Sequence, residues 1–411
     1  MVKVSFLIGS GFSVPAGYPT TKNINKKLQR INASEICVSS NRQAWFLNDQ
    51  PDPNSWINAE QRQFVQEFLE FYDTQVLKQG ESFHYETFYD YYISAYKTGS
   101  HSEALHNFLK SFKNKYNKNF DNLDLQNLLG TFHDIFSQLL AGQLNKPLRR
   151  VHRCEPYGSE CNAFLVLVGK LAQSSNVHFH SLNHDLYLEN LALSDTMQGD
   201  LDDGFEELGS QLYVKKYDEY ATYMIRLRRF TNKYESRFCL YKLHGSIDHY
   251  WCNFEDGFDL VKLPWTSGFL AHEIYKEFNR NGKYAYDNRS TDVVPDFLSG
   301  TTHKPNQYDR GPYYPLVHEH FKKNLTESKS LIVIGYGFGD LRINNYIEEN
   351  FLTDSDKVMF VVDIERPENA YLDRPNVHFI EGGVSGMNTK TILERISSNI
   401  GNLKDSCGTV K

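Results

Sequence analysis

The chain has 411 residues, 40% of them hydrophobic and 23% charged, a composition typical of folded globular proteins that excludes extensive disorder. This length is sufficient for two or three domain-sized units with a substantial core. The net charge of −7 provides no overall basic character, so direct nucleic-acid binding is not expected.

Two further features of the sequence concern the compartment of the protein. Met1 leads directly into an apolar run, without a basic segment and an apolar signal core, and no stretch is long and apolar enough to span a bilayer. The six cysteines are scattered without a Cys-x-x-Cys pair, which argues against a zinc ribbon or a disulfide framework. We therefore expect a cytoplasmic protein with buried free thiols, without zinc or another bound metal, and without membrane contact.

The first predicted element is the apolar run from Val4 to Ile8, typical of a buried parallel strand, which turns into a helix at a glycine-rich segment. Glycines let the backbone approach a phosphate closely, and the N–H groups of a following helix attract negative charge. The standard dinucleotide fingerprint is incomplete, because Val14 stands where its third glycine belongs. A turn that serves only strand–helix packing remains the alternative. The candidate phosphate-binding residues are Gly9, Ser10, Gly11, Phe12 and Ser13.

Helical patterning dominates the chain from about residue 23 to about residue 175. In AEQRQFVQEFLEFYDTQVLKQG, the residues Phe64, Phe68, Phe71 and Tyr72 recur at helical spacing. We interpret the region as an inserted, aromatic-rich helical subdomain whose aromatic stripes form a core and not a cofactor site.

Strand and turn signals alternate in the rest of the chain. NVHFHSLNHD predicts a strand that breaks into a helix at Asn183, and FCLYKLHGS predicts a strand followed by a His-Gly turn. Further strands are predicted within SLIVIG, KVMFVVD and NVHFIE. The basic cluster of Arg226, Arg228 and Arg229 is interpreted as a solvated face, and residues from about 253 to 312 as a loop-rich insertion.

This alternation predicts an α/β fold, with a Rossmann-like, mostly parallel sheet and helices on both of its faces. Ligands of such sheets bind at the carboxyl ends of the strands, so we expect the turns after the strands to line one crevice. These turns are residues 9–13, 183–185, 243–246, 335–340 and Asp363.

The turns, taken in order, resemble motifs of the sirtuin family of NAD-consuming enzymes. The family's Gly-Ala-Gly-x-Ser with Ala-Gly-Ile-Pro, its Gln-Asn-x-Asp and its His-Gly are similar to residues 9–13 with 16–19, 182–185 and 244–245. The block from Gly335 to Asp340 is similar to a distal motif of sirtuin-like bacterial proteins. Together these motifs span most of the chain.

The resemblance implies one discontinuous NAD-binding domain over residues 1–411 and a role for each matching residue. Asn183 would hold a water or the ribose, His244 would act as general base, and Asp185 would hold the nicotinamide carboxamide. The other NAD-binding residues would be Gly245, Ser246, Gly335, Tyr336, Gly337, Asp340 and Asp363. Blander alternatives stay open: Asn183 and Asp185 are also preferred helix N-caps, and the glycines also permit close packing.

Departures from the family pattern bear on the reaction. Thr20-Thr21-Lys22 replaces the Asp-Phe-Arg of the deacetylating members, and the Cys-x-x-Cys zinc module is missing. The resemblance therefore implies an NAD hydrolase of bacterial anti-phage defence, controlled by homo-oligomerisation or by a partner such as a HerA-type ATPase. A module that senses NAD or ADP-ribose without turnover is the alternative, and a protein deacylase or ADP-ribosyltransferase is disfavoured.

Overall fold

The computed structural model describes residues 2–38, 44–46, 58–78, 80–98, 102–116, 161–217, 222–254, 257–263, 274–280, 282–287, 292–297 and 311–400. The helical pattern expected between residues 117 and 160, and parts of the stretch from 253 to 312, lie outside these ranges.

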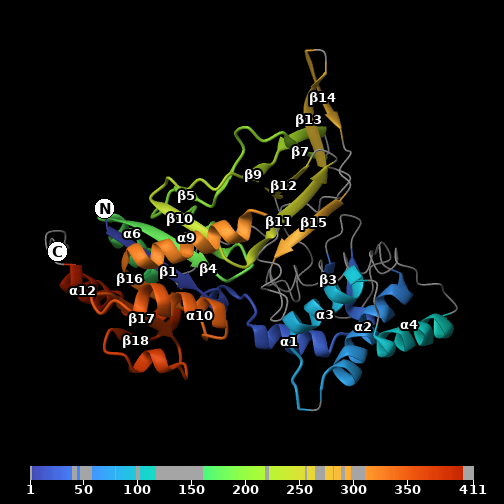
Figure 1. Cartoon of the computed structure of the whole chain (residues 1–411), viewed down its shortest axis with the longest axis horizontal. Coiled ribbons are helices and arrows are strands. Elements are labelled where there is room, and N and C mark those ends of the chain that lie inside the picture. Colours follow the sequence, from blue (N-terminus) through green and yellow to red (C-terminus); the bar gives the residue numbers. More distant parts are fainter. Residues whose placement is uncertain are drawn as a thin grey trace.

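Seven parallel strands of the described chain form the central sheet, in the order β18–β17–β16–β1–β4–β10–β5 (Figure 1). Their bounds are Val2–Ile8 (β1), Ser175–Ser181 (β4), Leu201–Asp202 (β5), Phe238–Lys242 (β10), Ser328–Ile334 (β16), Val358–Asp363 (β17) and Val377–Glu381 (β18). Apart from the two-residue β5, each strand coincides with a predicted apolar run, because strands buried on both faces need apolar residues on both sides.

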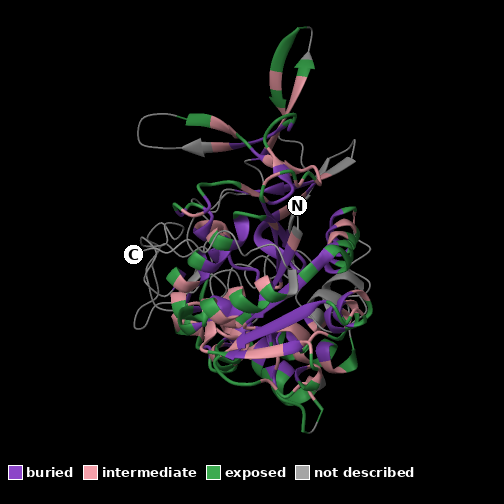
Figure 2. Cartoon of the chain, turned by 90° about the vertical axis from the view of Figure 1, so that its left-hand side faces the viewer, coloured by how far each residue is buried: buried purple, intermediate pink, exposed green. Residues whose placement is uncertain are grey.

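Helices cover both faces of this sheet. Phe6 of β1 packs into a core shared with α6, α7, α11 and α12, whereas its neighbour Leu7 points to a second core with α9 and α10. The bounds are Asn162–Ala172 (α6), Tyr187–Leu191 (α7), Tyr313–Glu327 (α9), Leu341–Ile347 (α10), Gly383–Gly386 (α11) and Thr389–Ile400 (α12). Figure 2 shows the buried strands between helices whose outer faces are exposed. The predicted α/β architecture is confirmed.

A helical subdomain with its own core lies beside the sheet domain (Figure 1). It contains α1 (Thr21–Gln29), α2 (Ala59–Phe71), α3 (Tyr85–Thr98), α4 (Glu103–Tyr116) and the hairpin of β2 (Ile36–Val38) and β3 (Ala44–Phe46). The predicted aromatic stripe is confirmed as core: Phe64 and Phe68 are buried, and their rings stack with centroids 5.6 Å apart. The expected boundary near residue 175 is wrong, because α6 packs on the central sheet and not on this subdomain.

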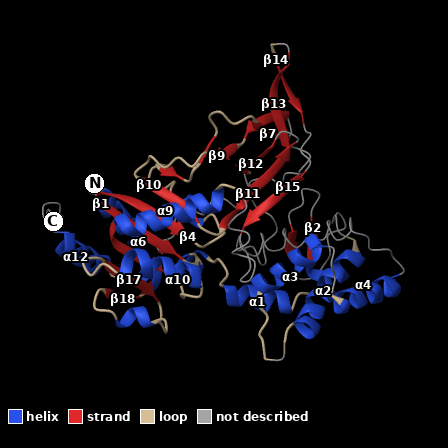
Figure 3. Ribbon diagram, in the orientation of Figure 1, coloured by secondary structure: helices blue, strands red, loops and turns tan. Residues whose placement is uncertain are grey.

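The expectation of a loop-rich segment from about 253 to 312 is also wrong for its described part, which consists mainly of strands (Figure 3). One sheet has the order β15–β11–β12–β9–β6 and another the order β14–β13–β7–β8. Their bounds are Phe205–Glu206 (β6), Leu212–Tyr217 (β7), Thr222–Arg226 (β8), Arg228–Phe230 (β9), Gly245–Phe254 (β11), Gly257–Lys262 (β12), Ile274–Arg280 (β13), Lys283–Asp287 (β14) and Asp292–Phe297 (β15). Polar residues in half-exposed antiparallel strands concealed the strand pattern from the sequence.

The basic cluster does not form a purely solvated face. Arg228 makes a two-pronged ion pair with the buried carboxylate of Asp203, at 2.6 and 3.0 Å, while Arg226 donates to the hydroxyl of Tyr213. Burial alone would raise the pKa of Asp203, but Lys262 and Arg228 outweigh it and lower that pKa to about 2. Arg226 and Arg228 therefore connect neighbouring segments of the β-rich region.

Within the described ranges, no helix is long and apolar enough to cross a membrane. Cys161, Cys239 and Cys252 are buried free thiols, as expected. The side chains of the other three cysteines lie outside the described residues.

Candidate functional site

The register of the central sheet brings the ends of its strands to one level. Ile8 pairs with Ser181 on one side and with Ile334 on the other, and Ser181 pairs in turn with Lys242. Backbone hydrogen bonds continue past these pairs: Leu182 N–H donates to Ile8 O at 2.9 Å. The turns after β1, β4, β10 and β16 therefore lie next to one another, as the parallel topology predicts.

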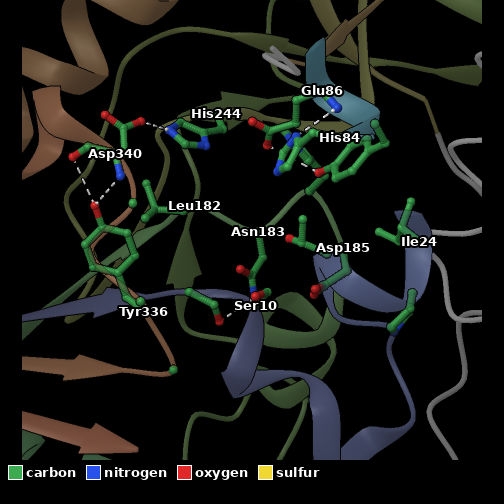
Figure 4. Close-up of a pocket in the computed structure, with 18 of the residues that line it drawn as sticks. Ser10, Ile24, His84, Glu86, Leu182, Asn183, Asp185, His244, Tyr336 and Asp340 are labelled. Atoms are coloured by element: carbon green, nitrogen blue, oxygen red, sulfur yellow. Dashed lines mark hydrogen bonds and ion pairs between the residues drawn. The ribbon is translucent and has the colours of Figure 1, made fainter. Parts of the chain in front are cut away.

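A cavity of about 620 Å³ opens above these turns (Figure 4). Its volume lies within the range of small-molecule and cofactor sites. The sheet domain contributes Gly9, Ser10, Tyr18, Pro19, Leu182, Asn183, His184, Asp185, His244, Gly335, Tyr336, Gly337, Gly339, Asp340, Leu341 and Arg342. The helical subdomain contributes Thr21, Ile24, His84, Tyr85 and Glu86. The cavity thus lies between the two units.

Glycines in two of the turns permit close packing at the floor of this cavity. Gly335 has a left-handed backbone, with φ of +63°, and an added Cβ would lie 2.5 Å from the carbonyl carbon of Gly11. A Cβ on Gly9 would lie 2.5 Å from the carbonyl oxygen of Gly335. Gly337 and Gly339, in contrast, have nothing within 4 Å of the position of a Cβ. The packing interpretation therefore applies to Gly9, Gly11 and Gly335, whereas Gly337 and Gly339 face open space.

The chain was expected to turn into a helix at residues 9–13 and to continue as a helix from Thr20-Thr21 through Leu28; only the second part is confirmed. Residues 10–12 and 14–16 form two short 3-10 turns, and the α-helix begins only at Thr21. The sharp turn at Gly17, with φ of +87°, separates them. A long helix dipole therefore does not point at Ser10, and a phosphate there would depend on individual N–H groups and side chains.

Asn183 joins the first and second turns. Its side-chain nitrogen donates to Gly9 O at 3.0 Å and to Ser13 Oγ at 3.1 Å, and the side chain is buried. It does not cap α7, whose N-cap residue is Leu186. Asn183 therefore fixes the shape of the cavity floor in addition to lining it.

Asp185 lines the cavity from a buried position. Its Oδ1 accepts the backbone N–H of Tyr187 at 3.0 Å, so the helix-start role expected for this carboxylate is present. Burial raises its pKa, against the opposing effects of Lys242, the Tyr187 N–H and the Ser13 hydroxyl. Lys242 also donates from Nζ to the carbonyl oxygen of Asp185 and lies 3.4 Å from Glu189.

His244 and Asp340 form a pair across the cavity wall. Nε2 of His244 lies 3.2 Å from Oδ2 of Asp340, while Oδ1 of Asp340 caps α10 by accepting from Arg342 N at 2.9 Å. The hydroxyl of Tyr336 bonds both the N–H and the carbonyl of Asp340, each at 3.1 Å. The backbone of Asp340 is therefore fixed by Tyr336, and its carboxylate is fixed by the start of α10, so that Oδ2 faces the ring of His244.

A second histidine supports the same turn. Nε2 of His318 in α9 lies 3.2 Å from the carbonyl oxygen of Leu243, one residue before His244. Burial, with a smaller contribution from His244, lowers the pKa of His318 to about 3, so its ring is neutral at pH 7 and donates to this carbonyl. His318 is a positioning residue that the sequence pattern did not indicate.

Several residues expected at the site lie outside the cavity lining. Phe12 is buried in the core against Phe164, with ring centroids 4.9 Å apart, and Gly11 and Ser13 pack behind the turn. Gly245, with φ of +75°, makes the reversal into β11 that no other residue makes as easily. Ser246 Oγ lies 3.4 Å from His184 O. Asp363 ends β17, but its carboxylate accepts from Ile364 N at 2.7 Å and does not line the cavity.

No pattern in the sequence indicated the contribution of the helical subdomain. His84, Tyr85 and Glu86 at the start of α3 reach the cavity, and Tyr85 is anchored by its N–H to Asn25 Oδ1 at 2.9 Å. Nor did any pattern indicate Arg342, which carries the one fixed positive charge among the described lining residues. These four residues belong to no recognisable motif, and only the packing of separate segments brings them together at the cavity.

Comparison with known proteins gives no family assignment from sequence: no family model and no curated protein matches the chain. Solved sirtuin structures are similar to it at low levels. Sir2Tm bound to a propionylated peptide has 11% identity and a TM-score of 0.33, with 97% of this chain and 93% of that chain covered. A Sir2–p53 peptide–NAD+ structure has 11% identity and a TM-score of 0.34, with 97% and 93% covered. At these values the similarity assigns no activity.

The chemistry available in the cavity follows from its own residues. It combines a carboxylate-oriented histidine, a buried amide, a buried carboxyl group of raised pKa and open glycine backbone. Among the described residues, no group of three or more His, Cys, Asp or Glu side chains is placed to hold a metal ion. The arrangement suits acid–base chemistry on a bound small molecule.

Proposed function

We propose that this cavity binds NAD and that the protein hydrolyses the bond between nicotinamide and ribose. The observation that carries the proposal is the His244–Asp340 pair at 3.2 Å, which faces the same cavity as Asn183 and Asp185. The order of the motifs in the chain, which resembles that of sirtuins, supports NAD as the ligand.

In the proposed reaction a water attacks C1′ of the nicotinamide ribose. The C1′–N bond breaks, and its electron pair goes to the pyridinium nitrogen, so neutral nicotinamide leaves. The water gives its proton to Nδ1 of His244, while the carboxylate of Asp340, 3.2 Å from Nε2, stabilises the imidazolium that forms. Asp185 holds the carboxamide of the leaving group, and ADP-ribose is the second product.

Other residues of the cavity lining suit the pyrophosphate. Gly9, Ser10, Gly337 and Arg342 combine open backbone with a guanidinium group. The guanidinium is oriented by a hydrogen bond from Nε to the hydroxyl of Tyr346 at 2.7 Å. An oriented guanidinium matches the oxygens of a phosphate group well.

The resemblance to sirtuin-like defence proteins suggests the biological use of this reaction: depletion of cellular NAD during phage infection. A constitutively active enzyme of this kind would kill its own cell, so control by assembly or by a trigger is required. We infer a homo-oligomer with a partner such as a HerA-type ATPase, and the helical subdomain, which closes one side of the cavity, is the element through which assembly would act.

The proposal is tested by product analysis after incubation of the purified chain with NAD, alone and with the protein encoded beside it. We expect equal amounts of nicotinamide and ADP-ribose, a loss of at least about 100-fold in kcat for His244→Ala, and wild-type rates for His106→Ala, an exposed histidine outside the cavity. Asn183→Ala is a poor single test, because it also removes the hydrogen bonds to Gly9 and Ser13.

Asp340→Asn tests the pair itself. We expect kcat to fall about tenfold or more with little change in KM, because the histidine loses its orienting carboxylate. If NAD binds but stays intact under every condition, the chain is a sensing module and the hydrolase proposal is wrong.

A further inference from the structure

We propose that Glu86, supplied by the helical subdomain, recognises the positive charge of the oxidised nicotinamide ring and so makes the cavity selective for NAD⁺ over NADH. This inference deepens the proposed function and rests on it. Glu86 belongs to no motif of the sheet domain and is contributed to the cavity by α3.

The position of Glu86 is fixed by its neighbours. Its Oε1 accepts from the hydroxyl of Tyr85 at 3.3 Å, and its backbone N–H donates to Nδ1 of His84 at 3.3 Å. Tyr85 is itself buried, and burial together with the charge of Glu86 raises its pKa well above the ordinary value, so the hydroxyl keeps its proton and donates. Glu86 thus presents a carboxylate of defined orientation to the cavity.

Glu86 lies at the nicotinamide end of the proposed substrate. Figure 4 shows Glu86 and His84 on the same side of the cavity as His244, whereas Ser10 lies at the opposite side. If the phosphates lie at Ser10 and C1′ lies near His244, the pyridinium ring faces the start of α3. The helical subdomain therefore supplies a negative charge where the ligand carries a positive one.

The other charged side chains around the cavity are less suited than Glu86 to attract the pyridinium ring. Asp340 is engaged with His244 and with the start of α10, and burial raises the pKa of Asp185, which disfavours its charged form. Arg342 is the one fixed cation among the described lining residues, and the other titratable groups besides these carboxylates are His84, His184, His244, Tyr18, Tyr85 and Tyr336. The half-buried carboxylate of Glu86 is thus well placed to attract a cationic ring, and reduction of that ring to neutral dihydronicotinamide removes the attraction.

The experiment compares the dissociation constants of two ligands that the enzyme does not cleave at this bond: carba-NAD⁺, whose pyridinium ring is charged, and NADH, whose ring is neutral. They are measured by calorimetry for the wild-type protein, Glu86→Gln, Glu86→Asp and the control Glu103→Gln. Glu103 is an exposed acid in the first turn of α4, so its variant has the same net charge as Glu86→Gln without altering the cavity. Nicotinamide release from NAD by the wild-type protein is measured in parallel.

We expect the ratio of NADH to carba-NAD⁺ dissociation constants to fall about fivefold in Glu86→Gln, through weaker binding of carba-NAD⁺ alone. Glu86→Asp should retain part of the ratio, and Glu103→Gln all of it. An unchanged ratio in Glu86→Gln, or an equal loss of affinity for both ligands, would overturn the inference. Nicotinamide release by the wild-type protein would in that case still support the proposed function. A wild-type protein that binds neither ligand would overturn both.

Discussion

Replacement of Gly335 by alanine tests whether the packing of the two glycine turns determines the stability of the sheet domain. The substitution has two separable costs. A non-glycine residue at φ of +63° costs roughly 1–2 kcal/mol, because Cβ approaches its own backbone. The new methyl group would also lie 2.5 and 2.6 Å from the carbonyl carbon and Cα of Gly11, and such overpacking costs about 1–3 kcal/mol. Together these costs give an expected loss of about 2–5 kcal/mol.

The matched control is Gly337→Ala, two residues further along the same turn. Its φ is not positive and no atom lies within 4 Å of its Cβ position, so we expect a change within about 0.5 kcal/mol. Both variants are compared with the wild-type protein by urea unfolding, followed by circular dichroism in the absence of ligand. Equal effects of the two substitutions, or a loss below about 1 kcal/mol for Gly335→Ala, would refute the packing argument.

Two other substitutions probe buried polar groups of the site. Asn183→Ala should reduce the free energy of unfolding by about 2 kcal/mol, because Gly9 O and Ser13 Oγ each lose a buried donor; an unchanged urea midpoint would contradict this. His318 has a folded-state pKa of about 3, lower than that of the unfolded chain at about 6.5, so its contribution to stability is complete above pH 6.5 and declines as the pH falls. By pH 5 the wild-type protein should lose about 2 kcal/mol through this group, and His318→Gln should show a correspondingly shallower decline between pH 7 and pH 5. Parallel pH profiles of the two proteins would show that His318 does not titrate in this way.

The composition of the cavity suggests how activity and assembly are connected. The acid–base pair His244 and Asp340 belongs entirely to the sheet domain, whereas His84 and Glu86 come from the helical subdomain. Each unit has a hydrophobic core of its own. Under the proposed function, a partner bound to the helical subdomain would act first on the side of the cavity formed by His84 and Glu86, before it affected the His244–Asp340 pair.

The fold of the sheet domain was predictable because its information is local. Parallel strands buried on both faces must be apolar throughout, so the runs that end at Ile8, Ser181 and Ile334 were recognisable one by one. The parallel topology then required their carboxyl ends to meet. The loop-rich interpretation after residue 253 failed for the converse reason: strands in half-exposed antiparallel sheets carry polar residues, and their pairing partners are distant in sequence.

The sequence by itself determined the architecture of the sheet, the residue types at its strand ends and the aromatic core of the helical subdomain, since each depends on the period and polarity of a short segment. Only the tertiary structure decided which of these residues meet. Asp340 lines the cavity and faces His244, Asn183 joins two turns through hydrogen bonds, and Glu86 enters the cavity from α3. These contacts join segments far apart in the chain, so their geometry depends on how whole elements pack and not on any local pattern.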